Sequence, residues 1–355
     1  MGQRWSRTAV HEKTHAEEAR NASTTTNTAE RAIAIWILWQ RVRRLKKLKK
    51  RKESARGKTT RQGLIAGGYA HSLALRRDGS IHSWGRNNFE QAPPEGFAGN
   101  FVSLAARVDF SIALRSDGTV ACWGRNNDGQ APPGGVRGAF VAIDAGFQHS
   151  LALTREGKVV CWGNNVYGQA PRGGVQGDFV SIAGGGNHSL ALGRDGSVTC
   201  WGANDFGQAP SEGVRGDFVA IAGGYWHSLA LRRDGRVVCW GRNTHGQAPP
   251  EGFPDDDFVA IATGAEHSLA LRRTGSIKFW GRNDEGQAPR HDVGTHKFVA
   301  IAGGRAHSLA LVSQDGHTAV ACWGSNWFGE APREHVKGTF EVPTLTRIGT
   351  DGENL

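Results

Sequence analysis

Histidine and cysteine recur in this chain at regular positions where they could do chemistry. Six histidines, each followed by Ser-Leu-Ala-Leu, form one series: His71, His149, His188, His227, His267 and His307. Five cysteines, each directly before a tryptophan, form another: Cys122, Cys161, Cys200, Cys239 and Cys322. Imidazole nitrogens and thiolates are common zinc ligands, and a positioned histidine can act as a general base. Metal binding and acid–base catalysis are therefore the first functions to consider.

The spacing argues against both. Each stretch of about 39 residues supplies at most one histidine and one cysteine of these series. Equivalent positions of separate units are too far apart to share a metal at bonds of roughly 2 Å, or to form a disulfide within roughly 7 Å between Cα atoms. We therefore expect structural, hydrogen-bonded histidines and buried unpaired thiols, which favour a reducing compartment. No Ser-His-Asp order or Cys/His cluster lies outside the repeats, so the sequence predicts no enzyme site, no metal and no cofactor.

The tryptophans define the organisation of the chain. Seven Trp-Gly pairs are separated by 39, 39, 39, 39, 40 and 43 residues. They begin at Trp84, Trp123, Trp162, Trp201, Trp240, Trp280 and Trp323. The histidine series runs in phase with them, and Phe110-Ser-Ile-Ala-Leu occupies the place of the missing member. Two motifs in phase over seven periods indicate one supersecondary unit repeated seven times.

Each repeat is expected to be an antiparallel meander of three short strands. In residues 179–217, for example, Gly-rich and Asp-Gly turns separate the segments 179–183, 188–192 and 197–201 and leave no room for a normal helix. The long connection that follows has room for a fourth strand. Large and small side chains alternate in His-Ser-Leu-Ala-Leu, which suits a sheet packed between two others. The repeats are too alike for a linear stack with special ends, so we predict an all-β fold, a seven-bladed β-propeller of 39–43-residue repeats.

The repeat also carries a family resemblance. Its pattern is Phe-Val-x-Ile-Ala-x-Gly-x-x-His-Ser-Leu-Ala-Leu, then Asp-Gly-x-Val-x-x-Trp-Gly-x-Asn and Gly-Gln. This resembles the regulator of chromosome condensation repeat, and the compact version in a bacterial β-lactamase inhibitor propeller more than the longer eukaryotic version. The resemblance covers residues 62 to about 345 and implies a seven-bladed propeller. Such propellers serve as exchange factors, inhibitors, ligase accessory domains and scaffolds, so the family implies binding rather than one activity.

The ends of the repeat array predict how the ring closes. The first repeat begins at Gln62 without the usual Phe-Val, and residues 339–342, Thr-Phe-Glu-Val, stand where an eighth repeat would begin. We expect this segment to pair within the blade that holds Trp84 and to cover its edge. The predicted parts of the chain are a disordered polar segment 1–29, a basic amphipathic helix and linker 30–61, the propeller 62–345 and a C-terminal tail 346–355.

Charge is distributed unevenly along the chain. Residues 1–61 hold 17 Lys and Arg and 5 Glu, a net charge of +12, which leaves 26 basic and 28 acidic residues, a net −2, for the rest. The propeller therefore lacks the basic excess typical of nucleic-acid binding. Chromatin binding by longer relatives depends on their own extensions. We expect a monomer whose propeller makes no nucleic-acid contact.

Residues 30–56 are expected to form one basic amphipathic helix. The apolar run 32–39 is too short to span a bilayer, and the charge follows it, unlike in a secretory signal. Nine of the twelve residues 41–52 are basic. Four interpretations stay open: a solvated tail, an anionic membrane surface as partner, a nuclear-import or nucleic-acid patch, and a calmodulin target.

Different residues carry these interpretations. A membrane-bound helix would place Trp36 and Trp39 at the interface, and Gly2 fits a myristoylation pattern that would add an anchor. The calmodulin pattern consists of Ile35, Trp39, Val42 and Leu48. The import patch consists of Lys46, Lys47, Lys49, Lys50, Arg51 and Lys52.

Strand parity predicts the binding face of the propeller. The turns between first and second strands share a face with the loops after third strands, because adjacent strands are antiparallel. Large aromatic residues, which are typical of interface hot spots, collect there. The candidate partner-binding residues are Tyr69, Phe89, Phe147, Tyr167, Phe206, Tyr225, Trp226, Trp327 and Phe328. The Arg-Asp-Gly turns lie on the other face, where Arg77, Arg155 and Arg233 are expected to contribute little to partner binding.

Together these observations predict a non-enzymatic, cytoplasmic propeller that binds a protein partner. The extension would add membrane association or, alternatively, nuclear localisation. One alternative function is a guanine-nucleotide exchange factor for a small GTPase, in line with the family; the propeller would then stabilise the nucleotide-free GTPase. A second is a secreted protein inhibitor of a hydrolase, which fits the short repeat but not the unpaired cysteines.

Overall fold

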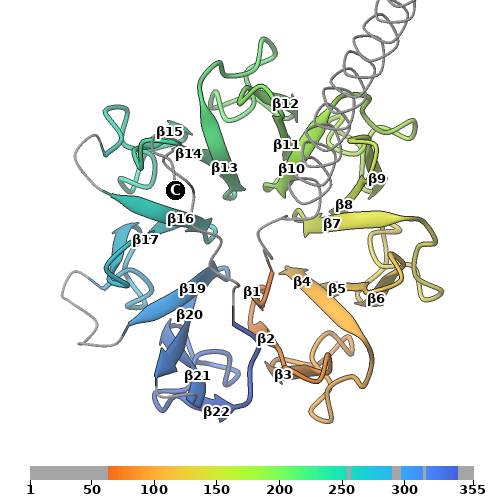
Figure 1. Cartoon of the computed structure of the whole chain (residues 1–355), viewed down its shortest axis with the longest axis vertical. Coiled ribbons are helices and arrows are strands. Elements are labelled where there is room, and N and C mark those ends of the chain that lie inside the picture. The colour runs from red at the N-terminus through yellow and green to blue at the C-terminus, as the bar shows by residue number, and fades with distance from the viewer. Residues whose placement is uncertain (1–62, 254–256, 290–296, 315–316, 343–355) are drawn as a thin grey trace, which may run out of the picture. The chain divides into compact units, whose positions relative to one another are not determined.

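Seven antiparallel sheets form a closed propeller. The computed structural model describes residues 63–253, 257–289, 297–314 and 317–342. Within the compact unit Thr60–Leu355 the seven sheets are arranged radially, and the first strand of each lies nearest the centre (Figure 1). The predicted seven-bladed β-propeller is thereby confirmed, and its blades are numbered 1 to 7 in chain order.

The strands are short and recur in the same order in every blade. Blades 1 to 3 consist of β1 (Ile65–Gly67), β2 (His71–Leu75), β3 (Ile81–Gly85), β4 (Phe101–Arg107), β5 (Phe110–Arg115), β6 (Val120–Gly124), β7 (Phe140–Ala145), β8 (His149–Thr154) and β9 (Val159–Gly163). Blades 4 and 5 consist of β10 (Phe179–Gly184), β11 (His188–Gly193), β12 (Val198–Gly202), β13 (Phe218–Gly223), β14 (His227–Arg232) and β15 (Val237–Gly241). Blades 6 and 7 consist of β16 (Phe258–Thr263), β17 (His267–Arg272), β18 (Ile277–Gly281), β19 (Phe298–Gly303), β20 (His307–Gln314), β21 (His317–Gly324) and β22 (Val336–Gly338).

A fourth strand is found in blade 7, where β22 pairs with β21. In blade 4 the corresponding contact is a single bridge between Val198 and Val214, and blades 1, 2, 3 and 5 repeat it. The connection is too irregular for a longer strand. Pro210 lacks an amide donor, and Gly213 has a positive φ of 70°.

The C-terminal segment completes blade 1, as predicted. Strand β1 has three residues, whereas β10 in blade 4 has six. Phe340 forms an antiparallel bridge with Arg76, and the amide of Glu341 donates to the carbonyl of Leu75 at 2.9 Å. Phe340 thus takes the place in blade 1 that Phe179 takes in blade 4. Because Phe340 is fully buried, packing as well as backbone hydrogen bonding closes the ring.

The hydrophobic core lies between neighbouring blades. Leu190 and Leu192 of β11 pack with Phe218 and Ile221 of the next blade. Ala191, between the two leucines, packs on the preceding blade instead. The alternation of large and small residues in the repeat therefore serves two interfaces, one on each side of the sheet.

The repeated histidines link the blades. His188 Nε2 lies 2.9 Å from Ser228 Oγ in the next blade, and six such pairs run along the ring, the last from His307 to Ser72. Ser228 donates its hydroxyl proton to the carbonyl of Gln208 at 2.9 Å, so the histidine Nε2 must carry a proton of its own. Burial lowers the pKa of five of these histidines to about 3 and that of His307 to about 4. The predicted structural hydrogen bonding is confirmed. In the described ranges no group of three His, Cys, Asp or Glu side chains could hold a metal ion.

The five cysteines are unpaired, as predicted from their one-per-blade spacing. Four are buried, and Cys322 is partly exposed, which corrects the expectation that all five are buried. Burial raises the pKa of each thiol to about 12, so none has thiolate character at neutral pH.

The predicted segments 1–29 and 30–61 and the tail 346–355 lie outside the described residues. Of the residues that are described, none form a helix long and apolar enough to cross a membrane.

Candidate functional site

The turns and loops that were predicted to share a face do so. The carbonyl of Trp226, between the first and second strands of blade 5, accepts a hydrogen bond from the amide of Arg242, after the third strand, at 2.8 Å. The same bond joins Ala70 to Arg86 in blade 1 at 2.7 Å. The face formed by these turns and loops is named the loop face, and the face of the Arg-Asp-Gly turns is named the opposite face.

The opposite face carries exposed ion pairs within single blades: Arg194–Asp178, Arg233–Asp217 and Arg273–Asp257. Their side chains are more than half exposed, so each pair adds little stability. Arg77 differs, because its Nε donates to the carbonyl of Phe340 at 3.2 Å and its amide donates to Thr339 at 2.9 Å. Arg77 therefore holds the segment that closes the ring, and its small contribution to partner binding stays a prediction.

The repeat motif makes the loops after the third strands rigid. In blade 4 the amide of Phe206 donates to Gln208 Oε1 at 2.9 Å, and the amide of Ala209 donates to Asn204 Oδ1 at 2.8 Å. Trp201 Nε1 of the same blade donates to the carbonyl of Gln169 in blade 3 at 2.9 Å. The Asn and Gln of the repeat, with Glu330 in place of Gln in blade 7, thus fold the loop, and the Trp of the following blade fastens it. Residues at the loop tips are held on a pre-organised backbone.

These loops carry the exposed large apolar side chains of the described propeller. Six large apolar side chains are exposed, and all six lie on loops after third strands: Phe89 (42%), Val166 (79%), Tyr167 (54%), Phe206 (47%), Trp327 (81%) and Phe328 (50%). Five of them are predicted partner-binding residues. Val166 is an addition, since it adjoins Tyr167 and was not among the predicted residues.

Four predicted residues form one aromatic group across blades 3 to 5. The ring centres of Phe147 and Tyr225 are 5.0 Å apart, those of Tyr225 and Trp226 are 4.4 Å apart, and those of Trp226 and Phe206 are 6.0 Å apart. The guanidinium of Arg242 lies 4.9 Å from the ring centre of Trp226 and 5.4 Å from that of Phe206. Tyr225 and Trp226 are half-buried, so they support the face as well as line it.

A second aromatic group joins blades 7 and 1. The guanidinium of Arg86 lies 5.3 Å from the ring centre of Phe328 and 6.0 Å from that of Phe89. Arg125 of blade 2 lies 5.9 Å from the same Phe89 ring. Trp327 stands beside Phe328 at the tip of the loop and is the most exposed aromatic side chain on this face. Tyr167, on blade 3, belongs to neither group.

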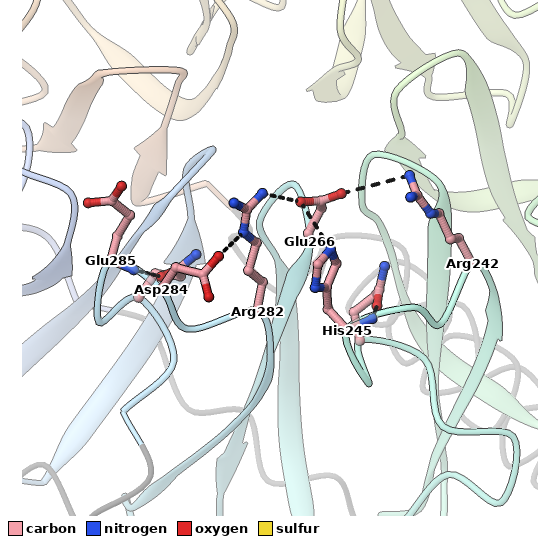
Figure 2. A network of polar contacts seen from close by, with 8 residues as sticks. Arg242, His245, Glu266, Arg282, Asp284 and Glu285 are labelled. Atoms are coloured by element: carbon pink, nitrogen blue, oxygen red, sulfur yellow. Dashed lines mark hydrogen bonds and ion pairs between the residues drawn. The ribbon is translucent and has the colours of Figure 1, made fainter.

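Charged residues separate the two groups over blades 5 and 6. Figure 2 shows Glu266 between Arg282, at 2.7 Å, and Arg242, at 3.9 Å. Asp284 contacts Arg282 from the other side at 2.7 Å, and His245 lies 3.8 Å from Glu266. The two arginines of this network are neutralised by the chain's own carboxylates.

The tips of the first turns meet at the centre of the loop face. They line a funnel with one tip residue from each blade: Tyr69, Val108, Phe147, Gly186, Tyr225, Ala265 and Arg305. Backbone hydrogen bonds join neighbouring tips, from Tyr225 to Ala265 at 3.0 Å and from Arg305 to Gly68 at 2.9 Å. The cavity of about 20 Å³ has room for about one water molecule, so it is no small-molecule site.

Arg107 reaches across this centre and was not among the predicted site residues. Its guanidinium donates to the carbonyls of Ala145 at 3.3 Å, Gly184 at 3.2 Å and Gly223, one from each of blades 3 to 5. Burial lowers the pKa of Arg107, and the carboxylate of Asp144 opposes that shift. The sequence does mark this blade as unusual, because blade 2 alone lacks both the Gly and the His that the other repeats have at these positions.

The replacement of the glycine by Arg107 is possible because the neighbouring histidine is also replaced. In the other blades a glycine adjoins the histidine ring, and a β-carbon at Gly146, for example, would overlap the ring of His149. Blade 2 has Phe110 in place of the histidine and Arg107 in place of the glycine. Ser150 of blade 3 accordingly lacks the histidine partner that equivalent serines have.

Comparison with protein families gives six matches to the model described as the regulator of chromosome condensation (RCC1) repeat. They span residues 64–91, 101–130, 140–169, 179–208, 218–247 and 258–287, which is half of the chain, and each falls on one of blades 1 to 6. A search of curated protein sequences gives no significant match.

Solved structures with this fold come from varied proteins. Prp20p of Saccharomyces cerevisiae, a protein with binding properties toward Gsp1p and histones, is 22% identical over 71% of this chain and 82% of its own, with a TM-score of 0.58. The CRINKLY WD40 ectodomain of the Arabidopsis thaliana receptor kinase ACR4 is 23% identical over 77% and 98%, with a TM-score of 0.60. Human WBSCR16 is 20% identical over 73% and 88%, with a TM-score of 0.62. At these identities the likeness shows the fold alone, and the repeat matches show the family: the chain belongs to the regulator of chromosome condensation (RCC1) repeat family.

Proposed function

We propose that this chain is a non-enzymatic propeller that binds a protein partner through its loop face. The observation that carries the proposal is the exposure of Phe89, Tyr167, Phe206, Trp327 and Phe328 on one face. Exposed aromatic side chains on rigid loops lose little conformational entropy on binding and bury a large area, which makes them suitable interface anchors.

The surroundings of these aromatics favour a protein partner over other ligands. Glu266 and Asp284 neutralise the arginines of blades 5 and 6, so a continuous basic surface for a phosphate backbone does not form there. The mixture of aromatic groups and paired charges is typical of protein interfaces, which combine apolar anchors with a polar rim.

A small GTPase is the partner class that the family suggests, and nucleotide exchange is the alternative function. Prp20p, which shares the fold, binds Gsp1p. Nucleotide release from a panel of small GTPases tests this alternative directly. Accelerated release by the wild-type chain would establish exchange, and unchanged release over the panel would leave a binding role without exchange.

The basic segment 30–56 completes the proposal as a targeting element, with an anionic membrane surface, calmodulin or nuclear import as its candidate uses. The propeller would act in the cytoplasm, or in the nucleus if the segment serves import. The positive charge of this segment lies outside the near-neutral propeller, so separate substitutions can remove targeting and partner binding independently.

Affinity capture followed by mass spectrometry tests the loop face. The full chain is compared with a Phe206→Ala/Trp327→Ala variant and with an Arg155→Ala/Arg233→Ala variant on the opposite face. The proposal expects proteins that are lost with the first variant and kept with the second. Identical sets with all three chains would contradict it.

A further inference from the structure

The loop face contains the same arginine–acid–arginine arrangement twice. The filled copy, in blades 5 and 6, consists of Arg242, Glu266 and Arg282. The open copy, in blades 1 and 2, consists of Arg86, Asp109 and Arg125 at the equivalent repeat positions. In each copy the arginines directly follow Trp-Gly pairs, and the acid lies in the first turn of the second blade. The two copies differ in how well their cations are paired.

In the filled copy every guanidinium has a carboxylate partner. Glu266 contacts Arg282 at 2.7 Å and Arg242 at 3.9 Å (Figure 2). Asp284, two residues after Arg282, accepts a hydrogen bond from Nε of that arginine at 2.7 Å. Two carboxylates therefore serve two guanidinium groups.

In the open copy the pairing is incomplete. Asp109 contacts Arg86 at 3.9 Å, and no ion pair joins Arg125 to any of the described residues. The position that Asp284 holds in blade 6 is Asn127 in blade 2, so the second carboxylate is missing. Accordingly, the buried Nε atoms of Arg86 and Arg125 have no hydrogen-bond partner among the described residues. One carboxylate therefore stands beside two guanidinium groups.

Aromatic rings lie close to both guanidinium groups of the open copy. The guanidinium of Arg86 lies 6.0 Å from the ring centre of Phe89, and that of Arg125 lies 5.9 Å from it. Arg86 also lies 5.3 Å from the ring centre of Phe328. An arginine stacked on an aromatic face keeps its in-plane donors available for a carboxylate. The exposed rings of Phe89 and Phe328 adjoin this positive site, and the exposed Trp327 directly precedes Phe328 in the same loop.

We propose that Arg86 and Arg125 bind a carboxylate side chain in an acidic segment of the partner protein. This inference rests on the proposed function and specifies the chemistry of its partner. The partner's carboxylate would supply the charge that Glu266 and Asp284 supply in the filled copy. Guanidinium groups bind carboxylates through paired, charge-assisted hydrogen bonds. Apolar side chains of the same segment would pack on Phe328 and Trp327. The chain's own segment 30–56 is basic, so its charge does not complement this site.

A labelled acidic peptide tests the site on the full chain. Fluorescein-labelled Ala-Glu-Glu-Phe-Glu-Glu-Ala is titrated and followed by fluorescence anisotropy at an ionic strength of about 0.15 M, where diffuse attraction to the basic extension is screened. The decisive variant is Asn127→Asp, which adds the missing carboxylate and removes no arginine. It should weaken peptide binding about tenfold, as should Arg125→Gln, because each removes the unmatched charge. The Arg155→Gln/Arg233→Gln variant, which loses the same charge on the opposite face, should bind like the wild type.

The filled copy provides the reciprocal test. Glu266→Gln with Asp284→Asn removes both internal carboxylates and should strengthen peptide binding. Wild-type affinity in both Asn127→Asp and Arg125→Gln would overturn the proposal. Stronger binding after deletion of residues 346–355, which include Asp351 and Glu353, would assign the site to the chain's own tail and also overturn it. If Trp327→Ala still abolishes partner capture while the charge variants have no effect, the loop-face function stands and this inference alone fails.

Discussion

Phe340 is paired with Arg76 across an antiparallel bridge, which joins the last described segment of the chain to blade 1. The side chain of Phe340 packs with Leu309 and Leu311 of blade 7 and with Ile65 of blade 1. One residue therefore supplies both the missing first-strand phenylalanine of blade 1 and part of the interface between the first and last blades. The ring closes by completing a blade from both ends of the repeat array.

Removal of the Phe340 side chain should open this closure. Phe340→Ala leaves a cavity at a fully buried site, which costs about 3–5 kcal/mol. At about 2–4 °C per kcal/mol for a large domain, the melting temperature should fall by roughly 10 °C. Calorimetry measures the shift, with Phe340→Leu as a milder control. Deletion of residues 339–355 should lower the melting temperature by several degrees or more, and an unchanged melting curve would show that the segment is dispensable.

Stability should fall steeply with acid because six histidines are buried in the neutral form. Their pKa values are about 3, and about 4 for His307, against 6.5 in the unfolded chain. The unfolded state therefore binds more protons below pH 6.5. The contribution of the neutral histidines to the free energy of unfolding is fully present above pH 6.5. It is lost as the pH falls toward 4 and 3, at up to about 1.4 kcal/mol per histidine and pH unit.

Urea unfolding at a series of pH values between 7.5 and 5 measures this slope. His149→Gln is the matched variant, because glutamine can still donate to Ser189 but does not titrate. Its slope should be smaller by about one proton. A stability that does not change over this pH range would contradict the buried neutral histidines.

The two loop-face tryptophans should differ in what they do for stability. Trp226 is half-buried against Tyr225, Phe206 and Arg242, whereas Trp327 is 81% exposed. Trp226→Ala should therefore cost about 1–3 kcal/mol, and Trp327→Ala should stay within about 0.5 kcal/mol of the wild type. Urea unfolding of the two variants and the wild type measures these changes in the free energy of unfolding. Equal losses would show that Trp327 is not the free anchor that its exposure indicates.

The segment 30–56 should bind as an independent element. A peptide of these residues should gain helicity on anionic vesicles or with calcium-loaded calmodulin, as measured by circular dichroism. Binding to vesicles should weaken with salt, because the Lys and Arg contacts are screened. A peptide that stays unfolded with both would support the solvated tail, and loss of nuclear localisation after replacement of residues 46–52 by Ala would identify import.

The repeats made most of the fold predictable, because they act locally. The Asp-Gly turns, the His-Ser-Leu-Ala-Leu strands and the Trp-Gly spacing each specify a short element, and strand parity then assigns the loops to faces. Even the closing role of residues 339–342 could be inferred from the missing Phe-Val of the first repeat.

What escaped prediction depends on side chains from different blades. Arg107 extends to carbonyls in blades 3 to 5, and its destination requires the closed ring. The pairing of Glu266 with Arg242 likewise crosses from blade 6 to blade 5. Arg107 breaks the repeat pattern, whereas Glu266 occupies a variable position of the repeat. Only the three-dimensional arrangement shows the contacts of either residue.

The affinity of the captured partner for paired loop-face and opposite-face variants tests the central claim most directly. Trp327→Ala and Phe206→Ala should each weaken binding by about 1–3 kcal/mol in isothermal titration calorimetry. Arg155→Ala and Arg233→Ala should bind like the wild type. If the opposite-face variants lose the partner while the loop-face variants retain full affinity, the loop face is not the binding surface.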